Sequence, residues 1–294
     1  MPPTSSEYWV HDLSPFLIQF PESWPIAGVS WYGLSYISGF AIAWWLLRNY
    51  AARGLTPLNQ DQRSGLLTAV IIGVIVGGRL GYMLLYARGN FLADPLLILR
   101  VWEGGMASHG GFIGVAVATI WYARSQGLHP LHLGDCLVSA APAGLLLGRL
   151  ANFINGELWG TPSTVSWAVI FPRSTPVFDP ETGFASLVPR HPSQLYQAGL
   201  EGLFLLIWCQ LRVRSGIFAF PGRLVGEFLA LYGVLRIGVE FFREPDVGIE
   251  PILGMSRGQF YSLFVVAIGL ALLLYTHLRK QGSHPDPKPV RKGS

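Results

Sequence analysis

The chain has 294 residues, of which 51% are hydrophobic and only 13% are charged. Soluble globular proteins carry about 25% charged residues, so this composition argues against a soluble domain and excludes a disordered chain. The 35 glycines and 21 prolines are spread among apolar runs, which is typical of membrane helices that pack closely. We therefore predict an all-α polytopic membrane protein.

The net charge of +4 does not indicate binding to nucleic acid, because all three lysines lie in the last fifteen residues. Residues 279–294 form a basic tail, which we expect to lie in the cytoplasm against anionic lipid. The two cysteines, Cys136 and Cys209, are too few for a disulfide framework.

Seven apolar stretches have roughly the 17–25 residues that a helix needs to cross the hydrocarbon core. They predict about seven transmembrane helices, at residues 31–47, 66–86, 106–122, 136–154, 194–211, 224–242 and 258–278. The long connection between them, residues 155–193, is rich in proline and contains alternating stretches. Loops of this length are usually functional, and we expect a small, partly extended head there on the outer side.

The positions of lysine and arginine predict the orientation of the chain. With the N-terminus outside, twelve of the 21 basic residues fall in inner segments and six in outer segments. Because cytoplasmic loops carry an excess of Lys and Arg, we predict an outer N-terminus and a cytoplasmic C-terminus.

Three arginines fall inside predicted spans: Arg79, Arg149 and Arg236. An arginine at a helix centre costs at least about 2.5–3.5 kcal/mol on insertion scales, which makes it a functional candidate. At about 1.5 Å per residue, all three lie roughly 7–11 Å below the outer surface. Since a planar guanidinium suits phosphate, their common depth predicts a phosphate site. A structural role is the alternative, most clearly for Arg236, which has Glu240 one turn away.

Two further side chains lie at the same level. Tyr32 opens the first predicted span, and His109 opens the third between two pairs of glycines. These glycines allow the backbone to approach a ligand closely, and histidine is the usual general base near neutral pH.

Metal-ligand spacing occurs only loosely, in His129, His132 and Asp135. The segment from residue 129 to residue 135 is more simply interpreted as a solvated loop on the inner side. We therefore expect neither a metal site nor a cofactor.

The densest group of polar residues is GRLANFINGELWG, residues 148–160. It combines an arginine with Asn152, Asn155 and Glu157 at the outer end of the fourth predicted span. Buried amides and carboxylates are unfavourable unless they bond partners, so this segment is too polar to serve packing alone.

This segment closely resembles the signature of the prolipoprotein diacylglyceryl transferase family. The resemblance covers nearly the whole chain in family order, through WYGL (31–34), GGRLGY (77–82), VWEGGMASHGG (101–111), RHPSQLY (190–196) and GEFLALYGVLRIGVEFFREPD (226–246). Ala151 stands where many members have glycine, and residues 161–188 match no motif of the family.

The resemblance implies a multi-pass enzyme of the bacterial inner membrane, with a periplasmic N-terminus and an active site near the outer leaflet. Such an enzyme would transfer the diacylglyceryl group of phosphatidylglycerol to the lipobox cysteine of a preprolipoprotein signal peptide. A thioether would form and glycerol 1-phosphate would leave, as the first step of lipoprotein maturation. The implied partners are phosphatidylglycerol, the signal peptide and membrane lipids.

Matching motif positions carry the functional roles of the family to Tyr32, His109, Arg149, Asn152, Gly160, Arg236 and Glu240. We predict that the catalytic residues are Tyr32, His109, Arg149, Asn152, Arg236 and Glu240. We predict that the substrate is bound by Arg79, Arg149, Asn155, Glu157, Gly160 and Arg243. His109 is the first choice for the base that deprotonates the incoming thiol, and the alternative is that it binds the lipid.

Three other kinds of membrane protein place ionisable groups inside a bilayer. A transporter or channel would more often show internal repeats and broken helices, and the sequence shows no repeat. An intramembrane serine protease would need a Ser–His pair, but Ser108 and His109 are helix neighbours that point apart. A non-catalytic lipid-binding protein would retain the arginines without needing His109 and Asn152. These features favour the transferase.

Overall fold

A computed structural model describes residues 8–24, 26–85, 87, 89, 91, 94–100, 105–178, 180, 183–245 and 251–279. The side chains of residues 85, 108 and 109 lie outside the described part, although their backbone is included. The side chain of His109, our first choice for the base, is therefore not among the described groups. The predicted basic tail beyond Arg279, residues 280–294, also lies outside the described residues.

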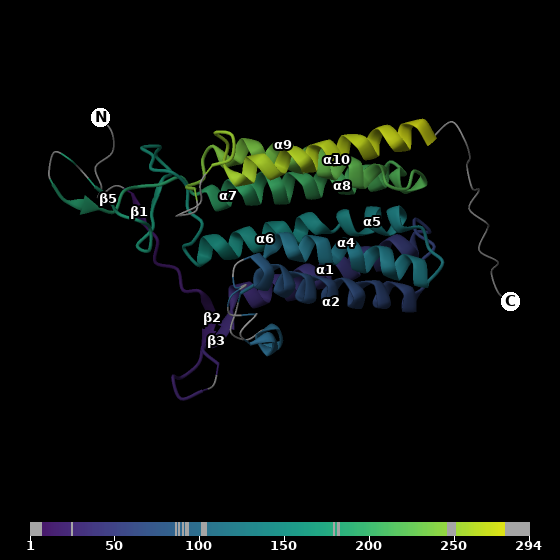
Figure 1. Ribbon diagram of the computed structural model, residues 1–294, viewed down its shortest axis with the longest axis horizontal. Coiled ribbons are helices and arrows are strands. Elements are labelled where there is room, and N and C mark those ends of the chain that lie inside the picture. Colours follow the sequence, from purple (N-terminus) through teal and green to yellow (C-terminus); the bar gives the residue numbers. More distant parts are fainter. Residues whose placement is uncertain are drawn as a thin grey trace.

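Helices that lie side by side along the long axis of the molecule make up most of the fold (Figure 1). The first group consists of α1 (Trp31–Ala52), α2 (Gln60–Leu85), α4 (Ser108–Ser125), α5 (Pro130–Val138) and α6 (Ala141–Ile154). The second consists of α7 (Ser193–Gln197), the π-helix η4 (Ala198–Phe204), α8 (Leu205–Arg214), α9 (Arg223–Glu240) and α10 (Arg257–Arg279). Helix α6 packs against both α1 and η4 and so joins the two groups.

Helices α2 and α10 are, among the described residues, long and apolar enough to cross a membrane. The pair α5 and α6, bent by 40°, passes the same test when taken as one broken span. The other predicted spans coincide with a helix or with a run of consecutive helices. The mostly helical membrane architecture expected from the composition is therefore confirmed.

The fourth predicted span, residues 136–154, corresponds to two helices rather than one. Helix α5 begins earlier, with Pro130 in its first turn, and α6 begins after a break, with Pro142 in its first turn. Proline is favoured at the start of a helix because its fixed φ suits the first turn and its missing N–H is not needed there.

Asp135 differs most from our expectation of a solvated loop, because it lies in α5 and is fully buried. Its carboxylate accepts the backbone N–H groups of Gly222 at 2.7 Å and of Val225 at 2.8 Å. The first N–H groups of a helix have no partner within it, and an anion is favoured there by the helix dipole. Asp135 therefore fixes the start of α9 against α5.

Short strands form a head at one end of the helices (Figure 1). Strand β1 (Trp9–Val10) pairs in parallel with β4 (Val169–Ile170), and β5 (Val177–Phe178) pairs antiparallel with β6 (Ala185–Ser186). A hairpin of β2 (Phe16–Gln19) and β3 (Gly28–Ser30) directly precedes α1. Within residues 155–193, β4, β5 and β6 are extended, and β1, in a part of the chain for which we predicted no element, pairs with β4.

The buried core lies among α1, α2, α5, α8 and α9. It includes Leu47, Leu66, Leu133, Leu205 and Leu224, all at most 1% exposed. The outer faces of the helices carry large apolar side chains instead, among them Trp121 (64% exposed) and Phe264 (55% exposed). So wide an apolar surface fits contact with lipid rather than with water.

Helices α2 and α4 cross at a stripe of glycines. A Cβ atom on Gly73 would lie 2.6 Å from the carbonyl oxygen of Gly114, and one on Gly77 would lie 2.8 Å from the Cα of Gly114. Farther along, a Cβ on Gly81 would lie 2.8 Å from the Cα of Gly110. Small residues let membrane helices approach backbone to backbone, so these positions accept no side chain without separating the helices.

We expect Gly114→Ala to destabilise the protein, because its new methyl group would lie 2.8 Å from the carbonyl carbon of Gly73. Overpacking of this kind costs typically about 1–3 kcal/mol. The control is Gly111→Ala in the same helix, whose methyl group would meet only the carbonyl oxygen of Val74 at 3.9 Å. The Tm of both variants in one detergent is the measurement, and equal values would show that the crossing tolerates a side chain.

Candidate active site

A cluster of polar side chains joins the start of α1 to the end of α6. The Tyr32 hydroxyl donates to Oε1 of Glu157 at 2.5 Å. Asn152 donates from Nδ2 to the same carboxylate oxygen at 2.9 Å and also contacts the Tyr32 hydroxyl. The Asn152 Oδ1 in turn accepts from Arg149 at 3.3 Å. The structure therefore brings together four residues that the sequence analysis selected.

One buried carboxylate links this cluster to α9. Glu201 in η4 is fully buried, and its oxygens lie 3.9 Å from Arg149 and 3.4 Å from Arg236. The two guanidinium groups therefore share a single partner between them. Both distances exceed the 2.7–2.9 Å of strong charge-assisted hydrogen bonds, so neither guanidinium has its donors fully used by Glu201.

The far end of the network is anchored between α9 and α10. Glu240 forms ion pairs with Arg236 at 2.9 Å and with Arg243 at 3.3 Å. It also accepts from the Ser256 hydroxyl at 3.0 Å, and Gly258 leaves room for its carboxylate. Arg236 therefore pairs with Glu240, as its spacing in the sequence suggested, and it also contacts Glu201.

Glu201 was missed by the sequence analysis although a signal for it existed. It is an acidic residue inside the apolar stretch 194–211, and an ionisable residue inside a span is a functional candidate by default. We applied that rule to the arginines only. Because two of those arginines need a counter-charge in a medium of low dielectric constant, a buried acid on a neighbouring helix follows from the same argument.

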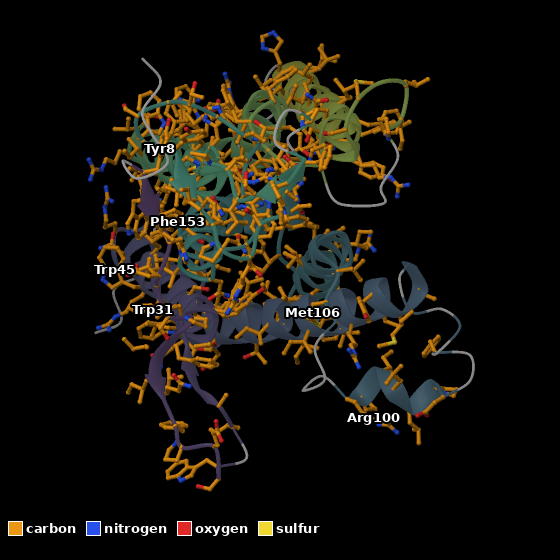
Figure 2. The ribbon with its side chains drawn as sticks, turned by 90° about the vertical axis from the view of Figure 1, so that its left-hand side faces the viewer. Tyr8, Trp31, Trp45, Arg100, Met106 and Phe153 are labelled. Atoms are coloured by element: carbon orange, nitrogen blue, oxygen red, sulfur yellow. The ribbon has the colours of Figure 1, made fainter. Side chains whose placement is uncertain are left out.

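Arg79 is used in a different way from Arg149 and Arg236. Arg79 is 3% exposed, and its guanidinium donates to four backbone carbonyl oxygens. The acceptors are Leu97 (2.5 Å), Arg100 (2.8 Å), Ile98 (3.2 Å) and Gly105 (3.2 Å). It therefore holds the short helix η2 (Pro95–Leu99) together with Arg100 and Gly105, and Figure 2 shows Arg100 to one side of the other helices.

The segment from Glu157 to Gly160, which we call the strap, follows α6 in an unusual conformation. Leu158 has a φ of 55°, a left-handed value that is strained for a residue with a branched side chain. Three side chains of the RHPSQLY motif hold the strap by its carbonyl oxygens. Gln194 donates to Glu157 at 2.6 Å, Ser193 to Leu158 at 3.0 Å and Arg190 to Gly160 at 3.2 Å.

Gly160 closes the strap against the end of α9. Its N–H donates to the carbonyl oxygen of His191 at 2.9 Å, and it forms an isolated β-bridge with Arg243. A Cβ at this position would meet the carbonyl oxygen of Phe242 and would lie 2.7 Å from the Cβ of His191. Gly160 thus acts through its lack of a side chain, which lets its backbone pair with the backbone of Arg243. The side chain of Arg243 in turn contacts Glu240.

Asn155 lies apart from Asn152. It is the C-cap of α6 and lines a cavity of about 170 Å³ in the head, together with His11, Asp12 and Arg173. Its Oδ1 is buried without a hydrogen-bond partner. His191, also in the head, packs against Tyr196 and Phe242, and burial lowers its pKa, which favours the neutral ring at pH 7.

The described groups supply charge and hydrogen bonds rather than metal ligands. In this part of the chain, no group of three or more His, Cys, Asp or Glu side chains could hold a metal ion. Arg149, Arg236 and Arg243 share two carboxylates in the ion-pair network, Glu201 and Glu240, and Glu157 adds a third carboxylate on the Tyr32 side. The guanidinium donors that the long contacts leave unused can bind an anion and stabilise further negative charge on it.

The comparison with known proteins agrees with the motifs. A family model described as prolipoprotein diacylglyceryl transferase matches residues 21–275. Three similar proteins are each named phosphatidylglycerol–prolipoprotein diacylglyceryl transferase. One from Methylococcus capsulatus is 44% identical, covering 90% of this chain and 99% of its own length. One from Cereibacter sphaeroides is 43% identical (90% and 96%), and one from Bradyrhizobium diazoefficiens is 41% identical (89% and 95%). The chain therefore belongs to the prolipoprotein diacylglyceryl transferase family.

Proposed function

We propose that this protein transfers the diacylglyceryl group of phosphatidylglycerol to the cysteine thiol of a prolipoprotein. The carbon–oxygen bond between the diacylglyceryl group and the phosphate breaks, and a carbon–sulfur bond forms. The thiol proton passes to a base, and glycerol 1-phosphate leaves with the bonding electrons. The observation that carries the proposal is the pair Arg149 and Arg236, which share one buried carboxylate.

The arginine pair suits the charge change of this reaction. A phosphodiester with one negative charge becomes a phosphomonoester with two, so the transition state gains negative charge on the phosphate oxygens. Preorganised donors at such a position commonly supply the largest single part of catalysis. Each guanidinium has five N–H donors, and the long contacts to Glu201 leave donors available to a phosphate.

The remaining cluster residues position this pair. Tyr32, Asn152 and Glu157 form a hydrogen-bonded group that contacts Arg149 through Asn152. Glu240 forms ion pairs with both Arg236 and Arg243. We assign Gly160 and the strap to the same task. Arg79 supports the chain around η2 in this proposal, and Asn155 contributes from the head.

The nucleophile comes from the substrate protein. Cys136 and Cys209 are free and fully buried, in α5 and α8, so neither can meet a phospholipid headgroup at the arginine pair. For the base we propose His109, which lies in the first turn of α4. An imidazole has an ordinary pKa of about 6.5 and accepts a thiol proton at neutral pH.

We further propose that the protein crosses the bacterial inner membrane with seven spans. The head and the N-terminus lie in the periplasm and the C-terminus lies in the cytoplasm. The arginine count supports this orientation. Helices α1, α4, α8 and α10 end on the side opposite the head (Figure 1), and their last turns or C-caps hold Arg53, Arg124, Arg212, Arg214 and Arg279. The active site then lies near the outer leaflet.

A transfer assay tests the function. Purified protein in vesicles receives phosphatidylglycerol labelled in its acyl chains and a peptide with a lipobox cysteine. We expect a labelled thioether product, and we expect none when the peptide cysteine is replaced by serine. Lipid binding without product would instead favour a non-catalytic lipid-binding protein.

Arg149→Lys should lose transfer activity although it keeps the charge. An ammonium group lacks the planar fork that binds phosphate at two points, and removal of one such donor costs about 10²–10³-fold in rate. The control is Arg212→Lys, which alters the bidentate contact of Arg212 with Glu227, both bonds 2.7 Å long, in a part of the bundle away from the site. Product formation is compared at equal protein levels, and full activity of Arg149→Lys would make Arg149 a structural residue.

His109→Gln should retain phospholipid binding but slow transfer by about 10²–10⁴-fold at pH 7, the usual contribution of a general base. The free thiol has a pKa of about 8.5, so raising the pH from about 6.5 to 9.5 converts it to thiolate and should partly rescue the variant. His277→Gln in the last turn of α10 serves as the control. Weakened lipid binding without rescue at high pH would instead make His109 a ligand of the lipid.

A further inference from the structure

A line of buried polar side chains in α7 and η4 is only partly used by the transfer chemistry described above. Gln194, Gln197 and Glu201 recur at spacings of three and four residues, which places them on one helix face. Each is at most 1% exposed. Gln194 holds the strap at one end and Glu201 holds the arginine pair at the other. Gln197 lies between these two.

Gln197 stands out because both of its amide atoms are buried without a hydrogen-bond partner. Oε1 of Gln194 is likewise unpartnered, and Oε2 of Glu201 has no hydrogen bond. In the great majority of cases, buried polar side-chain atoms have a partner, and no bulk water is available in the membrane interior to supply one. One helix face therefore presents unmet donors and acceptors beside the arginine pair.

The backbone at this point is also unusual. The π-helix η4 begins at Ala198, directly after Gln197, and π-helical turns occur frequently at functional sites. Gly202 brings η4 against α6, since a Cβ there would lie 2.6 Å from the Cα of Leu146. The contacts of Gln194 with Glu157, of Glu201 with Arg149 and of Gly202 with Leu146 show that the two segments run antiparallel. Gln197 therefore lies on the strap side of Glu201, about one turn from the level of Arg149.

We propose that Gln197, assisted by Gln194, recognises the two free hydroxyl groups of the phospholipid headgroup and so selects a glycerol headgroup. The inference rests on the proposed function. A carboxamide offers both donor and acceptor sites, and each hydroxyl needs both. When Arg149 and Arg236 hold the phosphate, the glycerol joined to it lies next to the neighbouring polar face. An amine headgroup fits less well, because an ammonium accepts no hydrogen bond and is repelled by the guanidiniums.

The test compares two phospholipid donors that share acyl chains and phosphate. One is phosphatidylglycerol and the other is phosphatidylpropanol, whose headgroup lacks both free hydroxyls. A site that bonds a substrate hydroxyl discriminates strongly against an analogue without it, so we expect wild-type kcat/KM to favour phosphatidylglycerol by at least about 10²-fold. In Gln197→Leu the ratio should fall to within about fivefold, since the unmet amide is gone.

Gln210→Leu is the matched control. It makes the same substitution in α8, where Gln210 bonds Tyr50 at 2.9 Å and Ser139 at 2.8 Å, and it should leave the donor ratio unchanged. A wild-type ratio in Gln197→Leu would overturn the inference and indicate ordered water at the amide. If Gln197→Leu does not accumulate, Gln197→Asn, which withdraws the amide by one methylene, should lower the same ratio.

Retention of the two lipids, measured by native mass spectrometry, separates this inference from the proposed function. Absence of thioether product from the wild-type protein with every donor would refute the function. The lipid retention ratio of wild type against Gln197→Leu would then still decide the inference. Product formation with an unchanged ratio would refute the inference and leave the function intact.

Discussion

A buried carboxylate between two guanidinium groups joins the second group of helices to the first. Charges removed from water need a partner nearby, and loss of one partner leaves the other charge uncompensated at high cost. Glu201 meets this need for both Arg149 in α6 and Arg236 in α9. Helices α6, η4 and α9 can therefore separate only by exposing unpaired charge to a medium of low dielectric constant. The same pairing keeps the arginines close together before any ligand arrives.

The strap explains why a motif without obvious chemistry accompanies the charged cluster. Arg190 is 1% exposed and donates to the carbonyl oxygens of Gly160 and Thr175 as well as to the carboxylate of Glu244. Ser193 and Gln194 donate to carbonyl oxygens of the strap. A segment with a left-handed residue at Leu158 keeps that conformation only when its surroundings fix it. Glu157 then projects toward Tyr32 and Asn152 from a fixed backbone. Positioning here acts through the main chain and not through contact between functional side chains.

Most of the helices and several members of the charged cluster could be predicted from the sequence, whereas the break between α5 and α6 could not. Apolar runs located α2 and α10, because length and hydropathy are local properties. The depth of Arg79 along its helix followed from the rise per residue, but its direction around the helix axis depends on packing. It therefore donates to carbonyl oxygens within η2 and at its C-terminal end, and not to the cluster of Arg149. The pairing of β1 with β4 joins residues far apart in the chain, and neither two-residue strand has a local pattern from which the pairing could be predicted.

The contact of Asp135 with the start of α9 has a consequence for the bilayer. Helix α9 has 18 residues and so is about 27 Å long, close to the hydrocarbon thickness of about 30 Å. Its first turn is fixed by Asp135 and its last turn by the ion pairs of Glu240. Helix α9 therefore fixes the distance between Arg236 and the end of the bundle that holds Asp135. In the orientation proposed above, a thicker membrane must deform around the protein, or its outer headgroups come to lie farther above the arginine pair.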